Sequence, residues 1–485
     1  MTYPELSTGM QALVRTSYGA FLLLTLIAAL PHWRRYFCAE PWGGYTQRGS
    51  LSSVIQRPFI VFVWLALWCA SAVALIAGRF VVPAAAFNLL TCYYFFNRLR
   101  WTSLSRGMGA PGFIAMWLGA AVLLLEVTRA HMPSAHGVVL LTLQVDFGLI
   151  MVSAGLYKLF AGYRHWSGME LGMANPEWGY WSSFWSRWSP RHPLFRFLNE
   201  MAWGTEVVCG VLMLFPVTRA WGGAGIALSF VFIATQIRLG FLCEMVITCC
   251  LLFFTAGTWP DQWLSAVLPP VPSRMVGEPW PLVASMLTAA CWIYMALLPL
   301  VRAGMFYNQL KHRSLPVPVQ RALDAYANAF GLILWRVFTA DVVNFFVRVW
   351  EVNPGGRRQI SDFAGRGWSR FAQVAECIVI TSVFTTLKYF PSNGALFQQK
   401  LLRYARTIPH APNTTLVFEW VHMRAGAHGF AHVPVAEFSV DGAHARVTET
   451  TLSDHVSVRA IAGASPVHEG ARPGSYAPRA PRVVS

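Results

Sequence analysis

Charged residues are scarce in this sequence, and lysine is almost missing from it. Charged side chains make up 12% of the 485 residues, and the 38 Lys and Arg residues include only four lysines, Lys158, Lys311, Lys388 and Lys400. Hydrophobic residues reach 55%, aromatic residues 14%, and the mean hydropathy is +0.44. A water-soluble domain rarely combines these values, so the composition predicts an integral membrane protein.

Several familiar motifs are also missing. The chain has no Walker A sequence, no Rossmann glycine set, no HExxH and no GxSxG, which removes the usual signatures of nucleotide binding, zinc proteolysis and serine hydrolysis. Its nine cysteines form no CxxC pair and lie mostly inside apolar runs, so neither disulfides nor zinc are expected. The spacing of five histidines does not suit metal binding either: His422, His428, His432, His444 and His455.

The basic residues and the N-terminal region exclude two further interpretations. The formal net charge is +16, but the basic residues lie mainly beside apolar runs, where they contact lipid headgroups. Nucleic-acid binding is therefore not expected. The first apolar run, residues 18–30, ends in PHWRRYF and not at a small-residue cleavage site. It is predicted to be the first membrane span and not a signal peptide.

Nine apolar segments are long enough, or nearly long enough, to cross a bilayer. They cover residues 12–30, 59–76, 82–96, 112–127, 138–160, 201–216, 222–237, 240–255 and 281–301. We therefore predict an all-α polytopic membrane bundle of about nine transmembrane helices, followed by a C-terminal α+β region with a small antiparallel β-unit.

The bundle is predicted to occupy residues 1–305 and to be followed by three smaller regions. Residues 306–400 should be helical and amphipathic or interfacial, because the helix-like stretches 319–350 and 371–390 carry internal charges. From Thr415 onward apolar residues alternate with period two, so residues 401–463 predict a β-rich soluble unit. Residues 464–485 are rich in Pro and Gly, and this composition predicts a flexible tail. Arginines in the loops 33–58 and 97–110 and after residue 301 favour a cytoplasmic C-terminal half.

Four tryptophans lie between the fifth and sixth predicted spans. Trp178, Trp181, Trp185 and Trp188 follow one another at spacings of three, four and three residues, which places them on one face of a predicted short helix. Such a helix is typical of an aromatic anchor at the headgroup level. It could also form a lid or an entry wall over a pocket beside Lys158.

Lys158 ends an apolar run, and it is the only lysine in the first 310 residues. Asp146 is about 18 Å away along the same helix at 1.5 Å per residue, so it is no direct partner. Glu206 lies in the first turns of the sixth span and is the better candidate. A desolvated lysine favours the neutral amine and can act as a general base. A carboxylate against it would hold it charged, so both a catalytic and a structural Lys158 stay open.

The segment around these residues resembles the vitamin K-dependent gamma-carboxylase family and its bacterial relatives, which share the HTTM membrane domain. The resemblance rests on AGLYKL at residues 154–159, HWSGMEL with Trp166 and Gly168, Glu206 thirteen residues before Arg219, and LGF at residues 239–241. The motif core covers residues 146–255. A family histidine before the last motif has no counterpart here, where Thr235 and Gln236 stand.

The resemblance implies a function for several residues. The family's matching lysine deprotonates vitamin K hydroquinone, so Lys158 would be the base and Glu206 a neighbouring acid that positions or tunes it. The expected residues of a substrate or cofactor site are Tyr157, Trp166, Gly168, Trp178, Trp181, Trp185 and Arg219. A vitamin K-like quinol would be the cofactor, and we expect no metal.

Three hypotheses follow from the sequence. The first is a carboxylase-like enzyme of the bacterial plasma membrane that uses Lys158 as a base on a lipid-soluble quinol or similar small molecule taken from the bilayer. The second is a non-enzymatic scaffold or lipid-handling protein in which Lys158 and Glu206 form a structural pair. A transporter ranks last, because few polar side chains lie in the predicted spans.

Overall fold

The structure is a computed structural model that describes most of the chain. It describes residues 3–49, 52–165, 168–267, 279–311, 315–330, 340–360, 370–389, 393–411, 414–426, 429–441 and 446–452. The predicted tail at residues 464–485 and Trp166 lie outside these residues.

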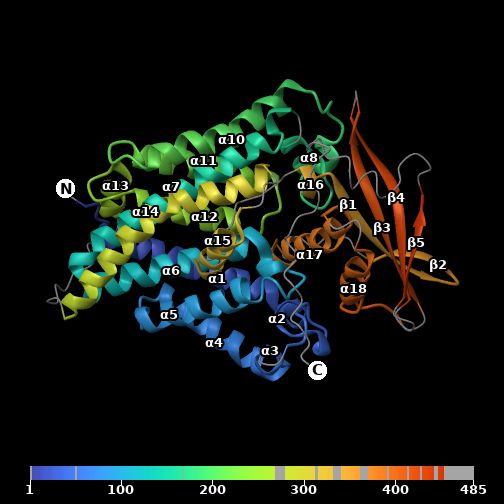
Figure 1. The fold of residues 1–485 in the computed structure, drawn as a ribbon, viewed down its shortest axis with the longest axis horizontal. Helices are drawn as coiled ribbons and strands as arrows, with labels where there is room; N and C mark the ends of the chain where they lie inside the picture. Colours follow the sequence, from blue (N-terminus) through green and yellow to red (C-terminus); the bar gives the residue numbers. More distant parts are fainter. Residues whose placement is uncertain are drawn as a thin grey trace.

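Most of the N-terminal part forms a bundle of long helices that run side by side (Figure 1). The longer helices are α1 (Thr8–Ala29), α4 (Pro58–Ile76), α5 (Val81–Cys92), α6 (Gly109–His131), α7 (Pro133–Phe160), α10 (Pro193–Met213), α11 (Arg219–Gln236), α12 (Leu242–Cys250) and α14 (Pro281–Lys311). Short helices at the bundle ends are α2 (Trp33–Phe37), α3 (Ser52–Ile55), α8 (Met169–Ala174), α9 (Ser182–Trp185) and α13 (Trp259–Val267).

The membrane-protein prediction is supported, but the number of spans is not confirmed. Each of the nine predicted segments falls on a helix, whereas only five helical stretches of the described chain are long and apolar enough to cross a membrane. These are Thr8–Phe37, Pro58–Ile76, Arg106–His131, Pro133–His165 and Pro281–Tyr307. Helices α5 and α12 have 12 and 9 residues, respectively, and α10 carries Arg196, Glu200 and Glu206.

Glycines bring α7 and α10 unusually close together. A Cβ atom added at Gly155 of α7 would lie 2.6 Å from the carbonyl oxygen of Trp203, and one at Gly210 of α10 would lie 2.8 Å from the backbone nitrogen of Val152. Small residues at helix interfaces let the backbones approach in this way. The close packing sets Lys158 opposite Glu206.

The C-terminal part contains a five-stranded antiparallel sheet with the order β2-β1-β3-β4-β5. Its strands are β1 (Phe345–Asn353), β2 (Gly356–Gln359), β3 (Thr415–Ala425), β4 (Phe430–Asp441) and β5 (Arg446–Thr451). The accompanying helices are α15 (Val317–Phe330), α16 (Ala340–Val343), α17 (Arg370–Tyr389) and α18 (Gly394–Ala405).

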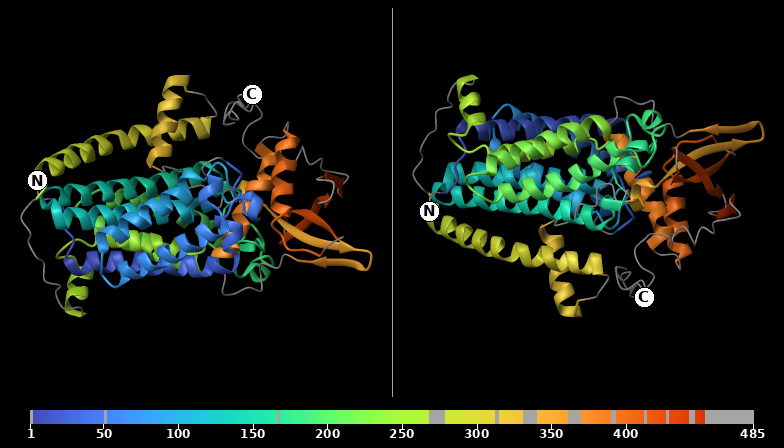
Figure 2. Two further views of the ribbon diagram at one scale, coloured as in Figure 1. Left: turned by 90° about the horizontal axis from the view of Figure 1, so that it is seen from below. Right: turned by 90° about the horizontal axis from the view of Figure 1, so that it is seen from above.

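Helices α17 and α18 lie between one end of the bundle and the sheet (Figures 1 and 2). Phe384 of α17 and Phe397 of α18 pack on Phe438 of β4, with ring centroids 5.8 and 4.9 Å apart, respectively. Phe418 of β3 contacts Tyr404 on α18. One face of the sheet is thus buried against helices, and the core is continuous from the bundle into the C-terminal part.

The helix-like interpretation of residues 319–350 is wrong at its C-terminal end. Helix α15 covers the first part, but Phe345 begins β1, whose burial alternates along FFVRVWEVN. Val347 and Val349 of β1 pair with Trp420 and Phe418 of β3, respectively. Strand pairing therefore outweighs the local apolar pattern. Two strands of the sheet, β1 and β2, therefore lie in the region 306–400 that was predicted to be helical. Helix α18 extends from that region into the predicted β-rich unit at residues 401–463.

Candidate functional site

Lys158 and Glu206 form a buried ion pair. Lys158 lies in the last turn of α7, and its Nζ donates to Oε1 of Glu206 on α10 at 2.5 Å. The two side chains are 6% and 2% exposed, respectively. The sequence predicted this encounter, and its physical origin is the close approach of α7 and α10 at Gly155.

Glu206 uses only one of its two carboxylate oxygens. Oε2 is buried, and within the described residues it has no hydrogen-bond partner. A buried acceptor without a donor costs free energy, because its hydration is lost and nothing replaces it. An additional donor, such as a hydroxyl group of a bound molecule, would satisfy this oxygen.

Three buried polar residues that the sequence did not single out are connected to the pair through Tyr163. Tyr163 is 1% exposed and lies within electrostatic range of Glu206 and Glu170. Asn199 of α10 donates to Oε2 of Glu170 at 2.7 Å and accepts from the backbone N–H of Met169. Burial raises the pKa of the Glu170 carboxyl. The signal for Glu170 was its place in the HWSGMEL motif.

Gly168 fits this arrangement as a backbone requirement. A Cβ atom there would lie 2.6 Å from Oδ1 of Asn199 and 2.7 Å from the ring of Tyr163. Its N–H donates to Oε1 of Glu170 at 3.1 Å. Gly168 therefore allows the chain to pass close to Asn199 and Tyr163, while Trp166 lies outside the described residues.

The predicted helix through Trp178 and Trp188 is wrong, because helix α9 covers only Ser182–Trp185. Gly179 approaches the backbone of Met173 so closely that an added Cβ would overlap the carbonyl oxygen. Residues 175–179 instead form hydrogen-bonded turns and an isolated bridge to Ile237. This packing overrides the helical spacing of the indoles.

Two of the tryptophans contact the end of α11. Nε1 of Trp181 donates to the carbonyl oxygen of Thr235 at 3.0 Å, and Nε1 of Trp185 donates to Oε1 of Gln236 at 3.2 Å. Trp181 is 58% exposed, whereas Trp178 is buried. Thr235 and Gln236 thus hold the tryptophan segment against the end of α11.

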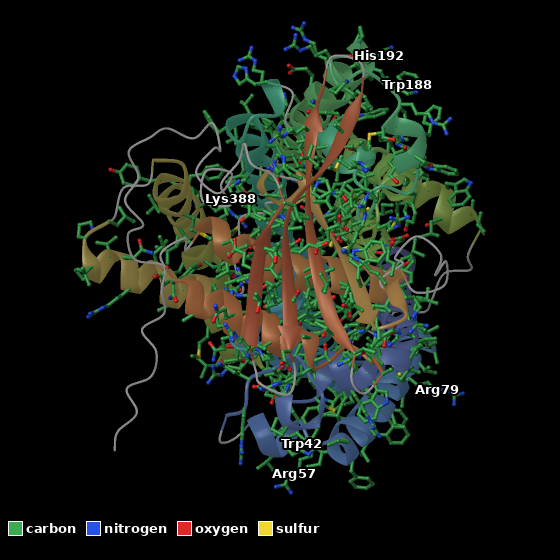
Figure 3. All side chains as sticks on the ribbon, turned by 90° about the vertical axis from the view of Figure 1, so that its right-hand side faces the viewer. Trp42, Arg57, Arg79, Trp188, His192 and Lys388 are labelled. Atoms are coloured by element: carbon green, nitrogen blue, oxygen red, sulfur yellow. The ribbon has the colours of Figure 1, made fainter. Side chains whose placement is uncertain are left out.

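Trp188 belongs to the outer end of the same segment. Its ring packs on that of Trp185, with centroids 5.5 Å apart, and on the ring of His192 at 4.6 Å. Trp188 and His192 lie together at one edge of the end face that carries the sheet (Figure 3).

Arg219 is not brought to the Lys158–Glu206 pair. Its Nη1 donates to Oε1 of Gln144 at 2.6 Å, and Nε2 of Gln144 donates to the carbonyl oxygen of Leu252. Gln144 precedes Lys158 by fourteen residues on α7, which is about 21 Å along a helix. Arg219 therefore belongs to a separate contact in the other half of the bundle. Tyr157, which precedes Lys158 in the sequence, is buried.

A second buried ion pair on α7 offers a comparison with the first. Nη2 of Arg302 on α14 donates to Oδ1 of Asp146 at 2.9 Å. Oδ2 of Asp146 accepts from Nε1 of Trp117 at 2.8 Å and from the hydroxyl of Tyr294 at 3.1 Å. Both carboxylate oxygens of Asp146 thus accept hydrogen bonds, whereas only Oε1 of Glu206 does so among the described residues.

The described residues hold no group of three or more His, Cys, Asp or Glu side chains placed to bind a metal ion. The Lys158 and Glu206 groups themselves can transfer protons, and their polar neighbours can donate and accept hydrogen bonds. No family model, no curated protein and no solved structure matches this chain.

Proposed function

We propose that this protein binds a lipid-soluble hydroxyl compound, of the quinol class, and moves a proton from it through the Lys158–Glu206 pair. The observation that carries the proposal is the unsatisfied Oε2 of Glu206, since the remaining contact of that carboxylate is with Lys158. The quinol class is suggested by the resemblance of the AGLYKL segment to the gamma-carboxylases.

The proton balance of the proposed step is simple. The pair holds one exchangeable proton, shared between the Lys158 amine and the Glu206 carboxylate. A substrate hydroxyl that hydrogen-bonds to Oε2 gives up its proton, which leaves an ammonium, a carboxylic acid and the substrate oxyanion. The positive charge of Lys158 stabilises that oxyanion in the low-dielectric interior.

The tryptophan segment is proposed as the entry wall for this molecule. Trp181 and Phe184 are 58% and 49% exposed, respectively, and flank the half-buried Trp185. Exposed aromatic rings beside apolar helices are typical of the membrane interface. A flat, lipid-soluble molecule would meet these rings before it reaches the pair.

A second candidate function is structural, and the short contact between Nζ of Lys158 and Oε1 of Glu206 favours it. In that case the pair fixes the register of α7 against α10 in a membrane scaffold. Replacing a buried pair by apolar residues is often tolerated, whereas removing one partner is not. The two candidates therefore differ in how a double variant behaves.

The experiment compares Lys158→Met, Glu206→Leu and their combination in purified full-length protein. Thermal unfolding reports folding. Oxygen uptake with an added reduced lipid-soluble quinone reports activity, because dissolved oxygen oxidises the quinol anion to the quinone, and is itself reduced to hydrogen peroxide, much faster than it oxidises the neutral quinol. We expect the double variant to fold and to show no activity above background. Quinol oxidation that equals that of wild-type protein in the folded double variant would disprove the proposed function, and recovery of folding alone, with no activity in wild-type protein, would assign the pair to the scaffold.

A further inference from the structure

Helix α13 lies across the direction of the bundle helices, at the end of the bundle opposite the sheet (Figures 1 and 2). One face of α13 packs on the bundle. Leu264 on this face is 6% exposed, and its side chain lies 3.8 Å from a Cβ atom added at Gly9 of α1. Asp261 is also buried and accepts a hydrogen bond from the N–H of Gly257 at 3.0 Å. These contacts fix α13 beside the start of α1, where the candidate span Thr8–Phe37 begins.

The exposed surface of α13 is divided into an apolar and a polar side. Trp259, Trp263 and Val267 follow one another every four residues, and they are 59%, 66% and 59% exposed, respectively. This spacing places them in one stripe along the helix. Gln262 and Ser265 are also exposed, and they lie between the stripe and the buried face. A helix with an exposed apolar stripe next to an exposed polar side is typical of a helix in the plane of the membrane interface.

Exposed aromatic side chains mark the same level on neighbouring helices. Phe80, in the turn between α4 and α5, is 81% exposed, and Trp221 in the first turn of α11 is 66% exposed. Trp280 directly precedes α14 and is 46% exposed. Its ring stacks on that of His131, the last residue of α6, with centroids 4.6 Å apart. Tryptophan is enriched where membrane spans meet the lipid headgroups, so these side chains place α13 at the membrane boundary.

The chemistry of the stripe indicates which partner covers it. The only charged residue of α13 is Asp261, which is buried against the bundle, so the stripe offers apolar contact and no ionic attraction. A stable protein interface takes roughly 20 to 30 residues from each partner, far more than this stripe supplies. A bilayer around the candidate spans, in contrast, reaches α13 at its boundary without any further contact. Lipid is therefore the partner that fits the stripe.

We propose that α13 is an interfacial anchor that inserts Trp259, Trp263 and Val267 between lipid molecules, at the boundary of headgroups and acyl chains. The anchor holds the N-terminal end of α1 at the membrane boundary, on the side of the bilayer opposite the sheet. Its partner is the uncharged part of the lipid, so a bilayer of net neutral lipids is sufficient. The anchor lies apart from the Lys158–Glu206 pair and does not depend on the proposed proton transfer.

The test uses fluorine magnetic resonance of full-length protein that contains fluorotryptophan, in phosphatidylcholine nanodiscs. Trp263→Phe and Trp350→Phe identify the two resonances by their loss, and Trp350 of β1 is the control outside the bilayer. The reagents are a lipid with a nitroxide at the start of its acyl chain and a water-soluble gadolinium chelate. We expect the lipid to broaden the Trp263 resonance more than the chelate does, and the reverse for Trp350. Equal or reverse broadening of Trp263 would place it in water, and no broadening would mean that protein covers it; both results would overturn the proposal.

Two matched variants test the stripe in the same nanodiscs. Val267→Asp and Ser265→Asp each add one negative charge to the exposed surface of α13, the first on its apolar side and the second on its polar side. We expect Val267→Asp to lower the unfolding temperature by a few degrees and Ser265→Asp to leave it almost unchanged, because only the first places a carboxylate among acyl chains. Equal unfolding temperatures of the two variants would also overturn the proposal. If Val267→Asp does not fold, the broadening of the Trp263 resonance decides.

Discussion

At the scale of single residues, the costs of burying charge explain which positions matter. Lys158 was conspicuous because a lysine in an apolar run must be paired, neutral or close to water. Its pairing with Glu206 was predicted because the two residues lie at a similar depth in two successive predicted spans. Glu170 and Asn199 could not be identified in the same way, because a carboxylate and an amide outside the apolar cores are common. Their importance arises from burial, which only the folded chain shows.

Removing one partner of the Lys158–Glu206 pair should destabilise the protein. Lys158→Met leaves the Glu206 carboxylate buried and unpaired, for which we expect a loss of about 3 kcal/mol in the free energy of unfolding. Denaturant unfolding in detergent measures this loss. Arg302→Met is the matched control, because Asp146 keeps its bonds from Trp117 and Tyr294. A larger loss in Arg302→Met than in Lys158→Met would contradict the account.

Glu177 predicts a pH dependence at the junction between bundle and sheet. It accepts a hydrogen bond from the N–H of Val347, and burial raises its pKa from 4.5 to about 8. Between pH 4.5 and 8 the folded state holds a proton that the unfolded state has lost, so this group's contribution to stability falls as pH rises. Glu177→Gln keeps the acceptor and cannot ionise. Its unfolding temperature should fall less than that of the wild type between pH 5 and pH 9, and an equal fall would contradict the assignment.

At the scale of secondary structure elements, backbone contacts determine the secondary structure of two segments for which the local sequence pattern predicted a helix. The period of the four tryptophans suited a helix, but the approach of Gly179 to Met173 ends regular structure there. Similarly, β1 follows an apolar helix-like run, and its strand character depends on pairing with β3, some seventy residues further along the chain. Such long-range contacts leave no signal in the local sequence, whereas the bundle helices were predicted from their long apolar runs, although only five of them qualify as candidate spans.

The packing of α7 on α10 can be tested with two glycines. Gly155→Ala places a Cβ atom 2.6 Å from the backbone oxygen of Trp203, so the helices must separate and the Lys158–Glu206 contact must lengthen. We expect a loss of about 2 kcal/mol and a loss of quinol-dependent activity. Gly204→Ala on α10 meets nothing within 4 Å and should stabilise the helix by up to about 1 kcal/mol. Equal effects of the two substitutions on unfolding would refute the close packing.

At the scale of the whole molecule, the sheet and the helices α17 and α18 cover one end of the bundle (Figure 1). Arginine-rich loops lie at this end, since Arg35 of α2 and Arg406, directly after α18, both make contacts there. The positive-inside rule therefore favours a cytoplasmic C-terminal part. Lys388 of α17 belongs to that part and is labelled in the view onto the end of the molecule that carries the sheet (Figure 3).

The scarcity of lysine makes this orientation measurable. A membrane-impermeant amine reagent should label Lys388 in inverted membrane vesicles and leave it unlabelled in intact cells, with peptide mass spectrometry as the measurement. Lys388→Arg controls for the identity of the labelled peptide. Labelling of Lys388 in intact cells would place the C-terminal part on the opposite side.

The central claim is that the Lys158–Glu206 pair takes a proton from a lipid-soluble quinol. The most direct measurement is the ultraviolet absorbance of the quinol anion, recorded without oxygen, when a reduced quinone is added to full-length protein in lipid nanodiscs at neutral pH. The account predicts that wild-type protein and Asp146→Asn generate the anion in proportion to protein, whereas Lys158→Ala and Glu206→Gln do not. No anion with folded wild-type protein, or equal amounts with Lys158→Ala, would contradict it.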